Sequence, residues 1–204
     1  MKKICFIFLL IAVTQGNYAQ VLIEDGKSAI EVKKAKKNGK WEVTTSRYTI
    51  SAGKNSKKVQ IRVKLASQTG EKVIIDPNKF YLVVDNYKIR VRPVDLKYPF
   101  ALASIAFVRL IKEDEYGSGN TARGGYNKND EVVDTFKDYA IPGYLDIETT
   151  LNFGSENKPR IKTIYYQPND IENSLVDIYF MLPKDVMQFS FYYGDILVEK
   201  ILID

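Results

Sequence analysis

The sequence predicts an all-β domain, and three observations lead to this prediction. Residues 175–204 read as three strands separated by turns, with apolar side chains at alternate positions. Residues 57–66 alternate basic and apolar side chains with the same period of two, the period of a strand with one buried face. Residues 80–84 and 87–91 are two further β-rich runs with a turn between them.

The chain begins with a predicted secretory signal peptide, residues 1–20. Lys2 and Lys3 give it a basic start, an apolar run follows, and small or polar residues complete it. The apolar run is much shorter than the ~20 residues that a membrane-spanning helix needs. We therefore expect an exported bacterial protein, periplasmic or secreted, with no transmembrane segment after cleavage. A short N-terminal anchor is the alternative.

Residue usage removes several kinds of chemistry. The apolar fraction of 45% suits a globular core, and the chain contains no histidine. Its one cysteine, Cys5, lies in the predicted leader. The mature chain therefore has no disulfide, no thiol nucleophile and no Cys/His zinc site. Ser-His-Asp and Cys-His catalysis are excluded, and no cofactor is predicted.

The charge balance argues against a nucleic-acid partner. When Lys2 and Lys3 leave with the leader, the basic residues fall from 30 to 28 against 25 acidic ones, a net charge of +3. Residues 27–40 are locally rich in lysine. One interpretation is a patch for an anionic surface such as lipid A or a polyanionic glycan. The favoured interpretation is a solvated, partly flexible N-terminal arm.

The first strands of the mature chain follow one another with short turns between them. Residues 41–51 are rich in β-forming side chains, and residues 52–56 predict a turn. Residues 57–66 predict a strand with one buried and one solvent-exposed face. Its apolar face consists of Val59, Ile61, Val63 and Leu65. Asp85 and Asn86 then form the turn of the next hairpin.

The middle of the chain, about 93–173, reads as a long insertion. Residues 102–111 are apolar nearly all round, so a buried helix and a strand both remain possible. Residues 113–134 are polar and glycine-rich and predict a long loop. Three short extended segments follow, at 132–144, 145–153 and 160–166. With no internal repeat and no linker, residues 21–204 are expected to form a single domain.

Two blocks of the chain carry a family likeness. The first, 59–85, contains a D-P-x-x-F-x-L segment made by Asp76, Pro77, Phe80 and Leu82. The second, 176–203, contains F-x-x-P at Phe180 and Pro183 before a final hairpin with its turn at Gly194 and Asp195. Together they resemble a family of secreted bacterial immunoglobulin-like domains of unknown function, which are associated with lipoproteins. This resemblance implies an immunoglobulin-like Greek-key β-sandwich and brings no catalytic residues.

Tyrosine is the compositional oddity, with 14 Tyr beside 10 Phe and one Trp. Two doublets stand out, and one ring of each is expected to point outward if both residues lie on a strand. Exposed tyrosines suit protein or sugar binding, although packing inside a β-sandwich is the favoured explanation. The predicted ligand or partner surface comprises Tyr165, Tyr166, Tyr192 and Tyr193 with Tyr116, Arg123 and Tyr126 from the central loop region.

Two other motifs in the central loop are candidates for ligand or metal sites. Glycines at 117–125 lack the spacing and the strand-to-helix context of a phosphate-binding loop. Acidic and amide residues at 113–115 and 127–134 offer oxygens for calcium, but their spacing does not fit an EF-hand. Solvated loop acids are the favoured interpretation, so no metal ion is predicted.

These observations favour a non-catalytic exported binding or interaction module with a protein or glycan partner. The alternative is a structural or envelope-associated accessory protein that docks by a sheet edge or by the lysine-rich arm. A carboxylate-dependent glycoside hydrolase is the third and least favoured hypothesis. Such an enzyme needs two paired carboxyl groups, and nothing in the sequence pairs two of them.

Overall fold

The structure is a computed structural model that describes residues 20–38, 42–44, 49–51, 55–99, 106–112, 126–129, 131–155 and 157–203. Within these ranges the protein is all-β, with two short 3-10 turns and no α-helix. The described residues include no helix long and apolar enough to cross a membrane.

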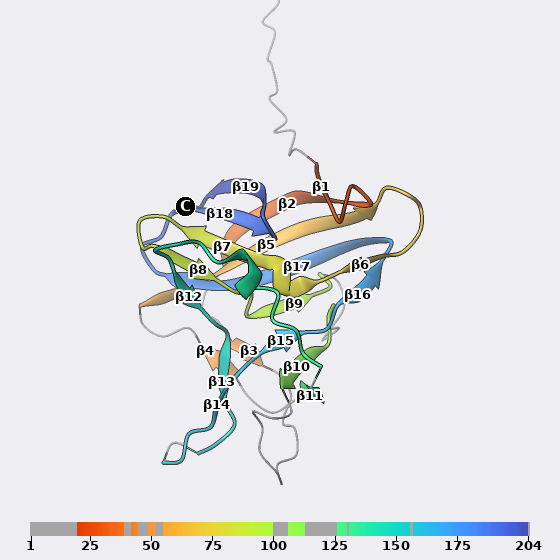
Figure 1. The fold of residues 1–204 in the computed structure, drawn as a ribbon. Coiled ribbons are helices and arrows are strands. Elements are labelled where there is room, and N and C mark those ends of the chain that lie inside the picture. The colour runs from red at the N-terminus through yellow and green to blue at the C-terminus, as the bar shows by residue number, and fades with distance from the viewer. Residues whose placement is uncertain are drawn as a thin grey trace, which may run out of the picture.

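Ten strands form two five-stranded sheets (Figure 1). Sheet 1 has the order β1 (Val21–Ile23), β2 (Ser28–Asn38), β5 (Ser56–Ser67), β17 (Asn173–Pro183) and β9 (Asp95–Lys97). Sheet 2 has the order β12 (Leu145–Ile147), β8 (Ile89–Val91), β7 (Phe80–Val84), β18 (Gln188–Tyr193) and β19 (Ile196–Leu202). All neighbouring pairs are antiparallel except β12 and β8, which are parallel.

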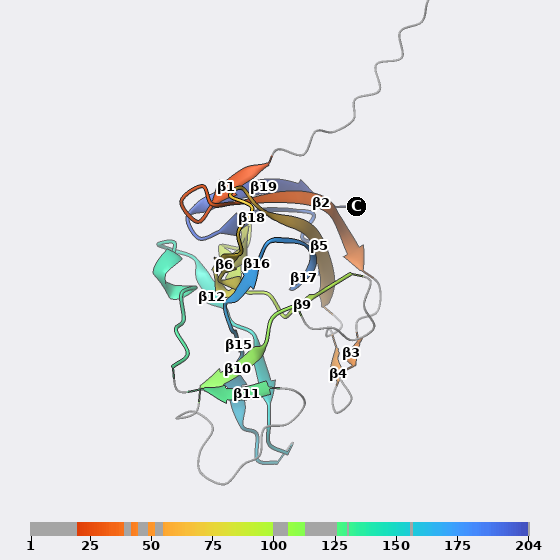
Figure 2. The same ribbon diagram turned by 90° about the vertical axis from the view of Figure 1, so that its right-hand side faces the viewer.

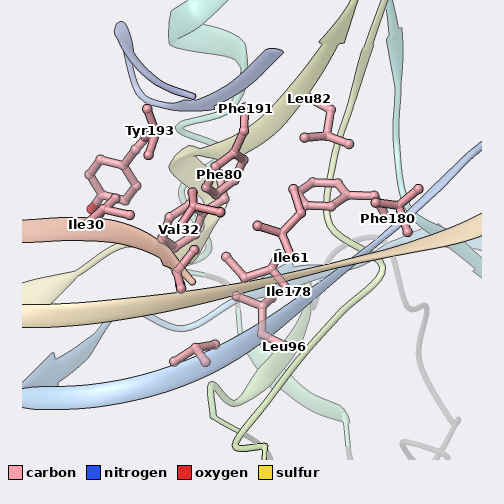
Figure 3. Close-up of a cluster of buried hydrophobic side chains, with 14 of the residues drawn as sticks. Ile30, Val32, Ile61, Phe80, Leu82, Leu96, Ile178, Phe180, Phe191 and Tyr193 are labelled. Carbon is pink, nitrogen blue, oxygen red and sulfur yellow. The ribbon is translucent and has the colours of Figure 1, made fainter. Parts of the chain in front are cut away.

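The main hydrophobic core receives side chains from both sheets, as in a β-sandwich (Figure 3). Phe80 of β7 and Phe191 of β18 stack with ring centres 5.7 Å apart. Phe180 of β17 meets Phe191 edge to face at 6.2 Å, which joins sheet 1 to sheet 2. Alternate residues of each strand face inward, so the period of two in the sequence becomes the buried layer.

The clearest sequence predictions are confirmed. The four apolar residues of β5 are fully buried. Strands β7 and β8 pair as a hairpin, as predicted, but the turn is longer than the predicted Asp85–Asn86 and also takes in Tyr87 and Lys88, whose φ is 51°. The C-terminal region forms β17, β18 and β19. On the opposite side of sheet 1, Arg62 pairs with Asp177 across β5 and β17, with Nε 2.7 Å from Oδ1.

The lysine-rich region was predicted wrongly as a flexible arm. It forms β2, which pairs with β5 from Ser28 to Asn38. Ile30 and Val32 of β2 are buried in the core, and a register shift between Val32 and Lys34 interrupts the alternation. This irregularity hides the strand in the sequence, because successive lysines then no longer alternate with apolar residues.

Smaller sheets accompany the sandwich, and most of them lie below it in Figure 1. One is three-stranded, and three others are two-stranded. Their strands are β10 (Arg109–Lys112) with β11 (Tyr126–Asn129) and β15 (Tyr165–Tyr166), β13 (Thr150–Asn152) with β14 (Ile161–Thr163), β16 (Asn169–Ile171) with β6 (Val73–Ile75), and β3 (Glu42–Thr44) with β4 (Thr49–Ser51). A 3-10 turn, η1 (Pro77–Lys79), precedes β7.

Several expectations for the insertion need correction. The predicted loop 113–134 contains β11, while 113–125 and 130 lie outside the described residues. The segment 132–144 is not extended throughout, because it carries the 3-10 turn η2 (Lys137–Tyr139). The open choice at 102–111 resolves toward a strand for β10, whereas 102–105 lies outside the described residues. In the predicted strand 41–51, the described residues Glu42–Thr44 and Thr49–Ser51 pair with each other as two antiparallel strands, while 41 and 45–48 lie outside the described residues.

Candidate functional site

A segment of the insertion that carries Phe136, Tyr139, Ile141 and Tyr144 covers part of the outer face of sheet 2, and it is called the docked segment below. Phe136, fully buried, packs with Tyr81 and Val83, which β7 points away from the main core. Half-buried Tyr139, Ile141, Tyr144 and Tyr192 surround this second cluster. Figure 2 shows the segment on the side of sheet 2 that faces away from sheet 1. The sandwich therefore has an additional layer over β7 and β8.

Arg90 of β8 holds this layer in place. Its guanidinium group is fully buried and makes two hydrogen bonds to Asp146 of β12, at 2.8 and 2.9 Å. It also donates to the backbone carbonyls of Phe136 and Tyr139. Its central carbon lies 4.2 Å from the centre of the Phe136 ring. A cation between aromatic rings with its donors satisfied is a stable way to bury an arginine.

Two further arginines tie the small sheets to the sandwich. Arg92 lies 2.9 Å from Asp134 and between the rings of Phe136 and Tyr165, at 4.9 and 5.0 Å. Arg109 of β10 pairs with Asp95 of β9, and both side chains are buried. Each pair joins residues from different parts of the fold, so the two pairs connect its layers.

A depression lies on the outer face of sheet 2, beyond the edge of the docked segment. Its volume is about 380 Å³, within the usual range for ligand pockets. Three places in the chain supply its walls: the β7–β8 turn, the β17–β18 turn, and residues of β18 and β19. The lining residues are Asp85, Asn86, Asp185, Met187, Gln188, Phe189, Ser190 and Lys200.

Tyrosine hydroxyls orient both carboxylates of the depression. The Tyr144 hydroxyl, from the docked segment, donates to Asp85 Oδ1 at 2.5 Å. The Tyr87 hydroxyl donates to Asp185 Oδ2. That hydrogen bond, followed by one from a backbone N–H and by the charge of Lys57, holds the pKa of Asp185 below its ordinary value. Asp185 is therefore an ionised acceptor at neutral pH.

The floor of the depression comes from the β18–β19 hairpin. Ser190 and Lys200 are direct partners in the antiparallel register, so their side chains lie on the same outer face. Gln188 is two residues before Ser190 and shares that face. Lys200 makes no ion pair within the described part of the chain. Its ammonium group is available to a ligand.

The tyrosines chosen from the sequence do not form one surface. Tyr165 and Tyr166 are only 6% and 3% exposed, so the expected outward ring of this doublet is not found. Tyr126 is also buried, at 3%. Strand β15 is covered on both faces, with Tyr165 against Arg92 and Tyr166 in the main core, which a pattern of alternation cannot reveal.

The second doublet behaves differently. Tyr192 is half-buried and stacks on Tyr81 with ring centres 5.2 Å apart. Tyr193 is buried, donates a hydrogen bond to Glu24 and accepts one from the backbone N–H of Asp76 at 3.2 Å. Burial, followed by the bond to Glu24, raises the pKa of Tyr193. Its role is to join β18 to the β1–β2 turn.

Two of the predicted surface residues, Tyr116 and Arg123, lie outside the described residues. The acidic residues weighed for calcium at 113–115 and 130 also lie outside them. In the ranges that the structure covers, no group of three or more His, Cys, Asp or Glu side chains is placed to hold a metal ion.

The sequence does not show that Asp85 and Asp185 line one depression. Asp85 lies in the turn of the β7–β8 hairpin and Asp185 in the connection from β17 to β18, and only the sheet order β8-β7-β18-β19 brings them together. Comparisons with known protein families, with curated proteins and with solved structures found no match to this chain.

Proposed function

We propose that the protein is an exported, non-catalytic binding module whose ligand site is the depression on sheet 2. The observation that carries this proposal is the convergence of three chain segments on one open hollow with two oriented carboxylates and an unpaired ammonium group. Binding sites of soluble domains commonly gather such polar groups at the ends of strands and in turns.

The carboxylates support binding rather than hydrolysis. A glycoside hydrolase needs one carboxyl group whose pKa is raised, so that it protonates the leaving group at neutral pH. The pKa of Asp185 is shifted in the opposite direction. Burial raises the pKa of Glu199 on β19, but Glu199 does not line the depression. An acceptor held ionised is suited to recognising hydrogen-bond donors.

The proposal also covers the topology of the fold and the export of the protein. We infer an immunoglobulin-like sandwich, supported by two packed five-stranded sheets and by the crossing from β17 in sheet 1 to β18 in sheet 2. We also infer removal of residues 1–20 on export. N-terminal sequencing of the protein from the producing cell tests this, with a start between 17 and 21 expected and a retained Met1 contradicting it.

An accessory protein that docks by a sheet edge is the second candidate. Strand β19 lies at one edge of sheet 2, and its Leu202 is 73% exposed. Two features argue against docking by this edge. The β18–β19 pair contains a register shift, and half-buried Glu199 lies next to the shift. Bulges and inward charges are the means by which proteins keep edge strands from pairing. The depression is therefore the better supported surface.

The test fills the depression without changing charge. Immobilised protein is incubated with envelope extract, and the retained material is compared between the wild type and Gln188→Trp. The control is Gln68→Trp, at an exposed position in the β5–β6 turn. We expect Gln188→Trp to lose what the wild type and the control retain. Equal retention by all three proteins, or by none, would overturn the proposal.

A further inference from the structure

The polar groups of the depression offer both halves of a hydrogen-bonding pattern. Asp85 and Asp185 are acceptors only, and Lys200 is a donor only. Asn86, Gln188 and Ser190 both donate and accept. A ligand that fits must therefore present donors and acceptors close together. Hydroxyl groups do this, because each donates one hydrogen bond and accepts others.

The charge of the depression restricts the ligand further. Two carboxylates stand against one ammonium group, so the local balance is negative. Phosphate and sulfate groups would be repelled by Asp85 and Asp185. The lining is mainly polar and open to solvent, which does not suit a purely apolar ligand. A neutral ligand rich in hydroxyl groups remains.

Apolar surface stands beside these polar groups. Tyr87 is 40% exposed and does not line the depression itself, but its hydroxyl donates a hydrogen bond to Asp185, which does. Met187, 44% exposed, lines the depression itself. A sugar ring has one face of C–H groups and a girdle of hydroxyls, and an aromatic ring next to oriented carboxylates matches both.

We propose that the depression binds a neutral saccharide unit, with Asp85 and Asp185 accepting from its hydroxyls, Lys200 donating to them, and Tyr87 packing on its C–H face. This inference rests on the proposed function and names the ligand class for the same site. The Tyr144–Asp85 hydrogen bond makes the docked insertion part of the recognition, since it orients one of the two acceptors.

The experiment uses a printed array of neutral oligosaccharides, followed by calorimetric titration of the best-bound one. Asp185→Asn should weaken that affinity tenfold or more, because a hydrogen bond to a charged acceptor is stronger than one to a neutral acceptor. Tyr87→Ala should weaken it by a similar factor, because it removes both the packing ring and the hydroxyl that orients Asp185. Tyr87→Phe should fall between Tyr87→Ala and the wild type, because it keeps the ring and loses the hydroxyl. Asp25→Asn, an exposed acid in the β1–β2 turn, is the control and should bind as the wild type.

The outcomes separate this inference from the function beneath it. A bound oligosaccharide whose affinity is unchanged in Asp185→Asn and Tyr87→Ala would overturn the site. A blank array together with Gln188-dependent retention from envelope extract would overturn the saccharide and leave the binding module in place. If the material retained from envelope extract is a peptide or protein, the saccharide would likewise be overturned and the binding module would stay in place. A blank array and no retention would overturn both.

Discussion

The guanidinium group of Arg90 lies against the ring of Phe136, with its central carbon 4.2 Å from the ring centre. Through this contact, β8 of the sandwich binds the segment of the insertion that carries η2. The same segment supplies Tyr144, which orients Asp85 in the depression. One buried arginine therefore links the stability of the insertion to the shape of the proposed site.

Arg90→Met is expected to lower the free energy of unfolding by about 3–5 kcal/mol. Arg90 is the fully buried member of its ion pair, and its removal leaves half-buried Asp146 and the carbonyls of Phe136 and Tyr139 without their donor. Urea denaturation measures the loss. Arg160→Met, at an exposed position, is the control and should change stability little. Equal effects of the two substitutions would contradict the role given to Arg90.

Tyr193→Phe is expected to lower the free energy of unfolding by about 1–3 kcal/mol, because the Asp76 N–H loses its acceptor and the Glu24 carboxylate loses the hydroxyl donor while keeping its ion pair with Lys79. Hydrogen exchange should increase in the β1–β2 turn before it increases in β18. Tyr98→Phe, at the margin of the core, provides the matched control. An unchanged exchange rate at 24–27 would show that the hydroxyl does not hold that turn.

Lys58 should titrate well below an ordinary lysine. Burial, followed by the charge of Lys97, lowers its pKa to about 8, while its ammonium lies 4.9 Å from the centre of the Tyr179 ring. Between this value and the unfolded pKa, the unfolded chain binds more protons, so stability from this group increases as pH rises from about 8 to about 10.4. NMR of ¹³C-dimethylated protein, assigned with Lys58→Arg, measures the pKa. A midpoint above 10 would contradict this environment.

Glu199→Val is expected to promote association through β19. The substitution removes a half-buried charge whose pKa is raised by burial, and it leaves an apolar edge strand with Leu197 and Leu202 exposed. Sedimentation at increasing protein concentration should show association for Glu199→Val. Glu71→Val, exposed in the β5–β6 turn, should sediment as the wild type. A monomeric Glu199→Val would mean that the register shift alone protects the edge.

The fold was predictable where the alternation of side chains is regular. Strand β5 and the strands after Leu175 follow this pattern, and their inward residues make the core. Strand β2 was not, since its register shift at Val32–Lys34 breaks the alternation. The prediction that one ring of Tyr165 and Tyr166 is exposed was wrong. Alternation places the two rings on opposite faces of the strand, but it does not show that both faces are covered.

The candidate site was predictable only in its parts. Asp85 and Asp185 were both recognisable as turn residues, and turns at strand ends commonly carry binding groups. Their meeting depends on which strands are neighbours, β7 beside β18, and local patterns do not encode that order. The burial of Arg90 and Arg92 could not be predicted either. Charged residues in a β-rich segment are expected on its solvent-exposed face, and these two are buried because the insertion covers them.

The most direct test of the account is NMR mapping of the bound oligosaccharide on the ¹⁵N-labelled protein. We predict amide shift changes confined to 85–88, 185–190 and Lys200, with smaller changes at Tyr144 through its bond to Asp85. Changes concentrated on the lysines of β2 or on the β19 edge, with residues 85–88 and 185–190 unmoved, would contradict the proposed site.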